Sequence, residues 1–263
     1  MVRGGGSLAA VQYGARRQGL PAPAERFLLD LLAGWLLQKR AWHVSGIGLV
    51  SPEPLHRLVV PRGGPPRQPK PLNDRDDVLK ILAFAASTSR HSINKAFVTH
   101  AAERLCAEHL PDAAVTLIDL NDYEMPIYSI DREREGGIPE HAKRWYAQIG
   151  EADALLISYA EHNGTYTAAY KNLFDWASRI DRKVFQGKPM TTFAVSVGRG
   201  GGGNVLKVAL ASAPHFGAEV VSSLSVPQFR ETFDVERGAL RDEALAGALG
   251  EALGQLARHL VGE

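Results

Sequence analysis

The sequence predicts a doubly wound α/β domain over residues 77–263, built on a five-stranded parallel sheet. Three observations predict it: a step in charge and proline content near residue 77, five strand-length apolar runs after that step, and helical patterns between the runs. Near-continuous apolar runs are typical of parallel strands covered on both faces. Strand and helix in regular alternation indicate that each pair of strands is joined by a helical crossover.

The composition sets the boundary of this domain. The chain has 263 residues, 45% of them hydrophobic, and a formal net charge of +1. Residues 1–76 hold 11 Lys and Arg against 5 Asp and Glu, a balance of +6, so the remaining residues hold 19 against 24, a balance of −5. Nine of the 15 prolines also lie in residues 1–76. We therefore expect a basic, weakly ordered N-terminal extension and linker over 1–76 and one domain over 77–263.

The extension contains an apolar segment, residues 24–42, that is predicted to be helical but is too short to span a bilayer comfortably. It lacks the arrangement of a secretory signal. Three interpretations stay open: an organellar transit peptide, a helix that packs on the domain or on a partner, and an appended segment without function. An appended segment without function is the simplest of the three interpretations, and we expect no catalytic role for the extension.

The predicted strands and helices alternate along the domain. The strand-length runs cover residues 78–87, 114–120, 153–160, 190–197 and 218–226, and the helical patterns cover 93–109, 139–150, 166–180, 205–216 and 240–260. The charged run 131–137 is expected to be a solvated loop. Because ligands of such sheets bind at the carboxyl ends of the strands, the loops that follow the strands are where a site is expected.

The loop after the first predicted strand, residues 87–94, combines hydroxyl, amide and basic side chains at the start of a helix. The residues concerned are Ser87, Ser89, Arg90, Ser92 and Asn94. The unpaired N–H groups and the dipole of a helix start favour an anion, so this pattern predicts a phosphate site. Capping of the helix by Ser92 or Ser89 is the simpler alternative, and it accounts for one hydroxyl.

Two further loops carry a weaker signal. After the third predicted strand come Glu161, His162, Asn163, Gly164 and Tyr166, where Gly164 allows a flat ligand to approach and Tyr166 is placed at the rim. A common Asn-Gly turn with Thr165 as a helix cap is the alternative.

After the fourth predicted strand, the loop 198–204 matches G-x-G-x-x-G and contains Gly198, Arg199, Gly200 and Gly201. The acid that a dinucleotide site needs would be Glu219, which lies at the wrong end of its strand, so a Rossmann site is rejected. A glycine loop against a planar ring is preferred to a mobile surface turn.

With these loops, residues 78–230 resemble the NADPH-dependent FMN reductase family of the flavodoxin-like superfamily, whose relatives include quinone, chromate and azo-dye reductases. The matching pieces are STSRHSIN at 87–94, EHNGTYTAAYKNLFDWASR at 161–179 and SVGRGGGGN at 196–204. The resemblance implies a flavodoxin-like sheet in the order 2-1-3-4-5. Ala160 and His162 stand where the family commonly has proline and tyrosine, and these departures bear on flavin affinity and pyridine-nucleotide preference.

The resemblance also assigns roles to the three loops. The first loop matches the family's FMN phosphate loop, and the other two match the loops that line the isoalloxazine ring. It implies NADPH or NADH as hydride donor, a small flavin or quinone acceptor, and a homodimer or homotetramer to which the helix at 171–179 contributes. A side chain acting as general acid or base is not implied, because FMN carries the hydride chemistry. Arg199 is a candidate contact for the phosphates of the nicotinamide cofactor.

Several classes of function remain to be compared. The predicted enzyme is an NAD(P)H-dependent FMN reductase or quinone-type reductase of the cytoplasm. The alternatives are a flavodoxin-like electron carrier without its own NAD(P)H reductase activity, and a domain that has lost its ligand. Because the chain has one cysteine and scattered histidines, we expect no metal site. The near-zero net charge predicts no nucleic-acid partner. We also expect no membrane span. Cys106, Trp145 and Trp176 are expected to be buried packing residues.

Overall fold

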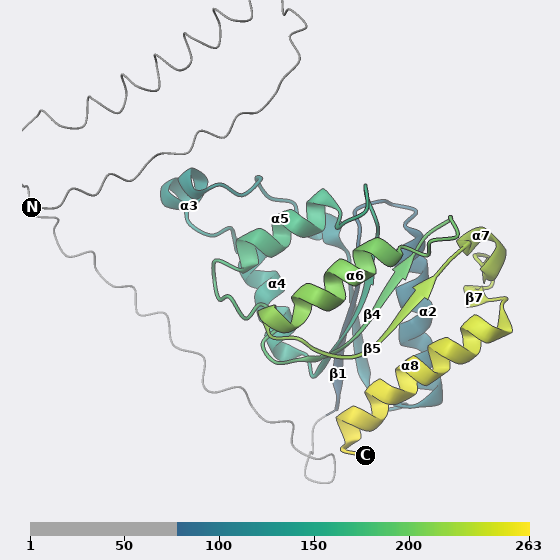
Figure 1. Cartoon of the computed structure of the whole chain (residues 1–263). Coiled ribbons are helices and arrows are strands. Elements are labelled where there is room, and N and C mark those ends of the chain that lie inside the picture. The colour runs from purple at the N-terminus through teal and green to yellow at the C-terminus, as the bar shows by residue number, and fades with distance from the viewer. Residues whose placement is uncertain (1–77) are drawn as a thin grey trace, which may run out of the picture. The chain divides into compact units, whose positions relative to one another are not determined.

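The computed structural model describes residues 78–263, so the predicted extension over 1–76 and its three interpretations lie outside the described residues. A parallel five-stranded sheet forms the centre, in the order β2-β1-β3-β4-β5 (Figure 1). This order confirms the flavodoxin-like prediction. The strands are β1 (Lys80–Ala86), β2 (Ala114–Ile118), β3 (Ala154–Tyr159), β4 (Pro189–Val195) and β5 (Glu219–Val226).

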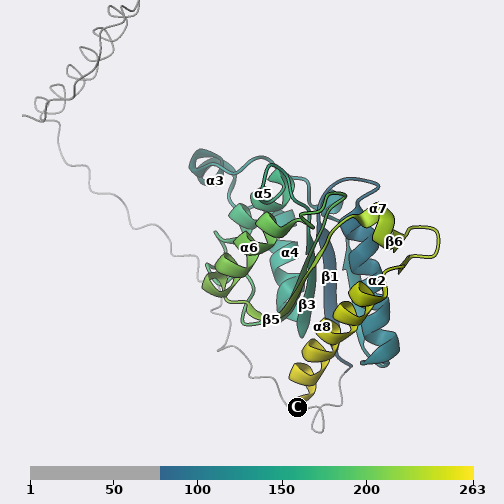
Figure 2. The same cartoon turned by 45° about the vertical axis from the view of Figure 1, so that its right-hand side comes forward.

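Helices cover both faces of the sheet, as right-handed crossovers require. Helices α2 (Ile93–Glu108) and α8 (Glu243–Val261) lie on one face, and α4 (Glu140–Glu151), α5 (Ala168–Ala177) and α6 (Gly203–Ser212) lie on the other (Figures 1 and 2). The five predicted helices are therefore confirmed, with their ends displaced by a few residues. The loops that follow the strands gather at the edge of the sheet away from the C-terminus (Figure 2).

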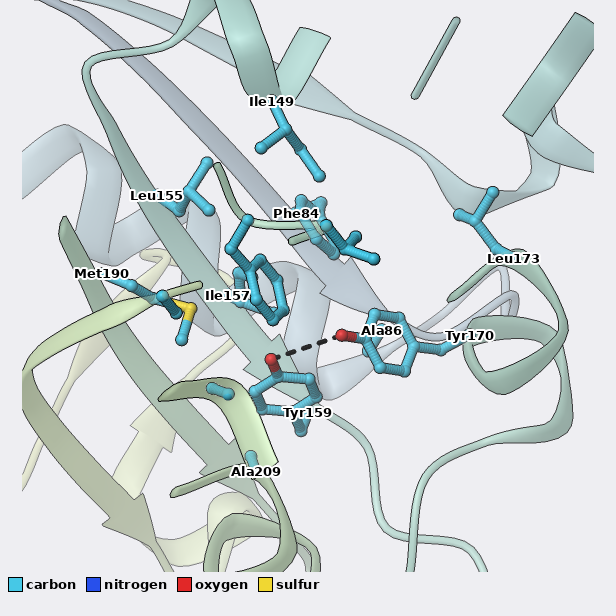
Figure 3. Packing of buried hydrophobic residues seen from close by; sticks show 14 of the residues in the cluster. Phe84, Ala86, Ile149, Leu155, Ile157, Tyr159, Tyr170, Leu173, Met190 and Ala209 are labelled. Atoms are coloured by element: carbon cyan, nitrogen blue, oxygen red, sulfur yellow. Dashed lines mark hydrogen bonds between the residues drawn. The ribbon is translucent and has the colours of Figure 1, made fainter. Parts of the chain in front are cut away.

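The core on the α4–α6 face is rich in aromatic side chains. Trp145 is fully buried and meets Phe84 edge to face at 5.8 Å between ring centroids. Tyr159 and Tyr170 are also buried, and their hydroxyls lie 3.5 Å apart (Figure 3). Burial raises the pKa of both phenols, so both stay protonated. Trp145 and Trp176, at 0% and 1% exposure, are buried as predicted, whereas Cys106 is half-buried.

The sequence prediction missed the short elements. The run 131–137, expected to be a loop, belongs mostly to the helix α3 (Ile130–Gly136), which Ser129 caps by accepting from the Arg132 N–H. The 3₁₀ turn η3 (Leu120–Tyr123), the helix α7 (Phe229–Thr232) and the hairpin of β6 (Phe233–Asp234) and β7 (Ala239–Leu240) were also missed. The end of the predicted helix 205–216 is a separate 3₁₀ turn, η4 (Ala213–Phe216). Such elements are too short to show a periodic pattern. Across residues 78–263, every helix is either too short or too polar to cross a membrane.

Candidate functional site

The loops after β1, β3 and β4 are joined pairwise by side-chain hydrogen bonds at the carboxyl edge of the sheet. Thr167, in the loop after β3, donates from its hydroxyl to the carbonyl of Ala86 at the end of β1, at 3.0 Å. Asn94 links the loop after β1 to Val195 at the end of β4. Glu161 links the loop after β3 to the loop after β4. The three predicted loops therefore lie together at one edge of the sheet.

The first loop presents backbone donors at the start of α2. The Ser92 hydroxyl caps the helix by accepting from the Lys95 N–H at 3.3 Å, and the Ser87 hydroxyl accepts from the Ser89 N–H at 3.2 Å. The N–H groups of Ile93 and Asn94 precede the first helical hydrogen bond and have no acceptor among the described residues. Ser89 and Arg90 are exposed beside them. This arrangement suits an anion. The capping alternative holds for Ser92.

Asn94 has a different environment from the one the sequence suggested. Its side chain is buried, at 2% exposure. Its amide nitrogen donates to the carbonyl of Val195 at 3.2 Å, while its amide oxygen accepts from the Val195 N–H at 3.1 Å and from the Ser158 hydroxyl at 2.8 Å. Asn94 therefore fixes the start of α2 against β3 and β4, and its contacts are those of a positioning residue.

The loop after β3 contains a tight turn. His162 and Thr165 exchange backbone hydrogen bonds of 3.0 and 3.2 Å, and the two residues between them, Asn163 and Gly164, have φ values of +52° and +80°. Positive φ at both central positions is the type I′ pattern, which Asn-Gly favours. The predicted turn is present, but Thr167 caps α5 in place of the expected Thr165. A Cβ added at Gly164 would meet no atom within 4 Å, so the backbone there is open to a flat ligand.

Glu161 does not lie free beside this turn. Its carboxylate accepts from the N–H groups of Asn204 and Val205, each at 2.9 Å, at the start of α6. Tyr166, which is predicted to lie at the rim of the site, is half-buried. Its ring packs against Tyr170 at 5.0 Å, and its hydroxyl lies 3.0 Å from that of Ser212 on α6. Burial raises the pKa of Tyr166, so this phenol remains neutral.

The glycines after β4 divide into two groups. A Cβ at Gly201 would lie 2.2 Å from the Ser225 hydroxyl oxygen, and one at Gly202 would lie 2.9 Å from the Ala194 Cβ; both residues have positive φ. These two glycines let the loop pack onto β4 and β5. Gly200 meets nothing within 4 Å and Gly198 only an atom at 4.0 Å. Together with the exposed Arg199, they form the open side of the loop.

The helix motif K-N-x-x-D-W holds a fourth segment, which sequence reasoning missed. Asn172 accepts from the Tyr128 N–H at 2.8 Å and donates to the carbonyls of Met125 and Pro126. Trp176, one turn later, donates from its indole N–H to the Pro126 carbonyl at 2.7 Å. These two side chains, four residues apart, face the same segment. They fix the chain between β2 and α3.

These features fit FMN. The N–H groups without an acceptor at the start of α2 suit its phosphate, since a helix start attracts an anion. The open backbone at Gly164 and Gly200 suits its flat ring, because side chains at these positions would occupy that space. The residues that would hold the group are thus those of the three loops, with Asn94 and Glu161 behind them.

The sheet order and this edge define a flavodoxin-like α/β protein with a mononucleotide site. The model of the NADPH-dependent FMN reductase family matches residues 79–231, and the chain belongs to that family. An NAD(P)H-dependent FMN reductase of Pseudomonas aeruginosa is 33% identical over 125 residues, which are 48% of this chain and 64% of that protein. A 2-hydroxy-1,4-benzoquinone reductase of Burkholderia is 36% identical over 121 residues, 46% of this chain and 62% of that protein.

Both alignments cover somewhat less than two thirds of the relatives. Among solved structures, FerB, a flavoenzyme NAD(P)H:(acceptor) oxidoreductase of Paracoccus denitrificans, matches with a TM-score of 0.56 at 22% identity. The match covers 70% of this chain and 97% of FerB. This likeness supports the fold.

Proposed function

We propose that this protein is an NAD(P)H-dependent, FMN-containing oxidoreductase that transfers hydride from NAD(P)H by way of FMN to a flavin, a quinone or a similar small acceptor. The observation that carries the proposal is the meeting, at one sheet edge, of an anion-attracting helix start with two open glycine positions. Membership of the family supports it. FMN, when bound, supplies the hydride chemistry between nicotinamide and acceptor.

The residues of the chain would bind and orient FMN and the nicotinamide cofactor. Ser87, Ser89, Arg90 and Ser92 would hold the phosphate of FMN at the start of α2. His162, Asn163 and Gly164 would flank the ring from the β3 side, and Gly198 and Gly200 would flank it from the β4 side, with Gly201 packed on β5 behind them. The exposed guanidinium of Arg199 attracts the phosphates of the nicotinamide cofactor. No side chain is assigned as general acid or base, so the protein contributes position and electrostatics.

We also propose a homodimer or homotetramer, with a contact along α5 and α6. A groove of about 300 Å³ runs between these helices, lined by Tyr166, Phe174, Phe216 and neighbouring residues. Val208, at 37% exposure, and Leu210, at 36%, lie on the same helix α6. Burying apolar groups of this kind favours association. The acidic balance of the domain suits the cytoplasm, which is where we place the enzyme.

The test begins with the absorption spectrum of the purified full chain. We expect either a flavin spectrum or uptake of added FMN, followed by steady NADPH or NADH oxidation when a benzoquinone is supplied. The matched variant is Ser89→Asp, which should lose FMN while keeping the fold. A protein that takes up no FMN would contradict the proposal. Rapid one-electron exchange without steady NAD(P)H turnover would instead favour the electron carrier.

A further inference from the structure

The start of helix α6 is closed by a residue that is distant in sequence. The helix follows a glycine loop, its cap residue Gly202 has no side chain to offer, and its first turn contains no acidic residue. Glu161 supplies what is missing: one carboxylate oxygen accepts from the N–H groups of Asn204 and Val205, each at 2.9 Å. The other oxygen lies 3.4 Å from the amide nitrogen of Asn204.

The hydrogen bonds to Glu161 are stronger than hydrogen bonds between neutral groups. Hydrogen bonds from backbone N–H groups to a carboxylate are charge-assisted, and the positive end of the helix dipole attracts the same charge. The donors belong to residues 43 and 44 positions along the chain from Glu161. The contact therefore joins two loops that the chain itself connects only through α5 and β4.

Because Glu161 lies directly before the His162–Thr165 turn, the bond fixes one open glycine position relative to the other. Gly164 follows in that turn, and Gly200 belongs to the loop that leads into α6. With its first-turn donors already engaged by a carboxylate, the start of α6 attracts no further anion. The start of α2 is left to take the phosphate.

We propose that Glu161 is a positioning residue, which holds the two ring-flanking loops in one fixed relation and closes the start of α6 to the phosphates of FMN and NAD(P)H. The inference rests on the proposed function, because the ring and phosphates are those of its cofactors. Glu161 itself touches none of the reacting atoms.

The first test uses the full chain without FMN. Amide hydrogen exchange is measured at Asn204 and Val205 in the wild type, in E161Q, in E161A and in the control E151Q, which removes the same charge from an exposed residue at the other edge of the sheet. We expect exchange at both amides to be at least about tenfold faster in E161A, less so in E161Q, and unchanged in E151Q. E161Q retains an acceptor oxygen, so it reports even if E161A folds poorly.

The second test measures FMN. We expect E161A to bind FMN about tenfold more weakly, as the loss of about one charge-assisted hydrogen bond predicts, and its flavin reduction potential to differ from that of E151Q. Unchanged exchange in E161A, or faster exchange with FMN affinity and potential equal to those of E151Q, would overturn the inference. A wild type that takes up no FMN would overturn the proposed function and the role toward FMN, whereas faster exchange in E161A would still establish the bond between the loops.

Discussion

Helices α2 and α6 begin at the same edge of one sheet, yet the chain treats their N-termini in opposite ways. Helix α2 is capped by its own neighbour Ser92, and the N–H groups of Ile93 and Asn94 have no acceptor among the described residues. Helix α6 has no capping side chain nearby and receives the carboxylate of Glu161 from another loop. The start of any helix attracts an anion. The place where a phosphate binds therefore depends on the carboxylate that occupies the start of α6 as well as on the donors that remain available at the start of α2.

The same contrast applies to the residues behind the two loops. The α2 loop is held by a neutral side chain, Asn94, whose bonds are all to buried groups. The α6 loop is held by its glycines, which pack directly on β4 and β5. A single substitution can remove either the hydrogen bonds of Asn94 or the close packing of the glycine loop.

Removing Asn94 should have the largest effect. Asn94→Ala leaves both backbone groups of Val195 and the hydroxyl of Ser158 without their partner in a buried place, so we expect a loss of about 4 kcal/mol in the free energy of unfolding. Urea denaturation measures it. Ser158→Ala, which removes one of the three bonds, is the control and should cost about 1 kcal/mol. If Asn94→Ala lost less unfolding free energy than Ser158→Ala, the positioning role of Asn94 would be contradicted.

In the glycine loop, we expect the free energy of unfolding to be sensitive to a side chain at Gly201 and insensitive to one at Gly200. Gly201→Ala places a Cβ against the Ser225 hydroxyl at a positive φ, so we expect a loss of about 3 kcal/mol in unfolding free energy. Gly200→Ala meets open space and should change stability by less than about 0.5 kcal/mol, while weakening FMN binding. Thermal unfolding and FMN titration of the two variants separate packing from binding, and equal stability losses would contradict the division.

Giving α2 a carboxylate of its own should make it resemble α6. Ser89→Asp places a negative charge at the open helix start, where it satisfies the donors and repels a phosphate. We expect FMN binding to weaken about 100-fold, which corresponds to about 2.7 kcal/mol, with the unfolding free energy unchanged or raised by about 0.5 kcal/mol. Fluorescence titration and denaturation measure the two quantities. Ser89→Asn, which adds no charge, is the control and should retain most of the affinity.

The sheet and the three loops were predictable because each depends on local sequence. Apolar runs identify buried strands, and an Asn-Gly pair or a Ser before a helix indicates its own turn or cap. The partners of Asn94 and Glu161 were not predictable, since their hydrogen bonds reach residues 101 and 43 positions away. A polar residue in a ligand-binding loop has the same appearance in sequence whether it faces the ligand or the protein behind it.

The K-N-x-x-D-W motif illustrates the same limit. Its sequence indicated a helix, and the resemblance suggested an intermolecular contact. In the structure Asn172 and Trp176 bind the backbone between β2 and α3, a contact that sequence reasoning missed. Both side chains lie on one helix face, but which segment they meet depends on the crossover from β2, and no short-range pattern in the sequence encodes that.

The smallest expected effect concerns the charges beside the start of α2. Lys95, in its first turn, lies 2.5 Å from the carboxylate of Asp119 at the end of β2. Burial raises the pKa of Asp119, but the hydrogen bonds from Lys95 and Asn121 outweigh it, so the pKa in the folded protein lies below its ordinary 3.8. A depressed carboxylate pKa stabilises the fold above the ordinary value, and this contribution is lost as the pH falls through the folded value.

Asp119→Asn should therefore cost about 0.5 kcal/mol at pH 7, as expected for a partly exposed pair, and the difference from the wild type should shrink as the pH falls below about 4. Urea denaturation at pH 7, 5 and 3.5 measures it. Glu140→Gln removes a carboxylate that is 83% exposed in its pair with Lys143, and it should leave the pH dependence unchanged. A constant difference between Asp119→Asn and wild type at all three pH values would show that the Lys95–Asp119 pair does not contribute through its charge. Helix α2, unlike α6, would then begin without a stabilising carboxylate from a neighbouring loop.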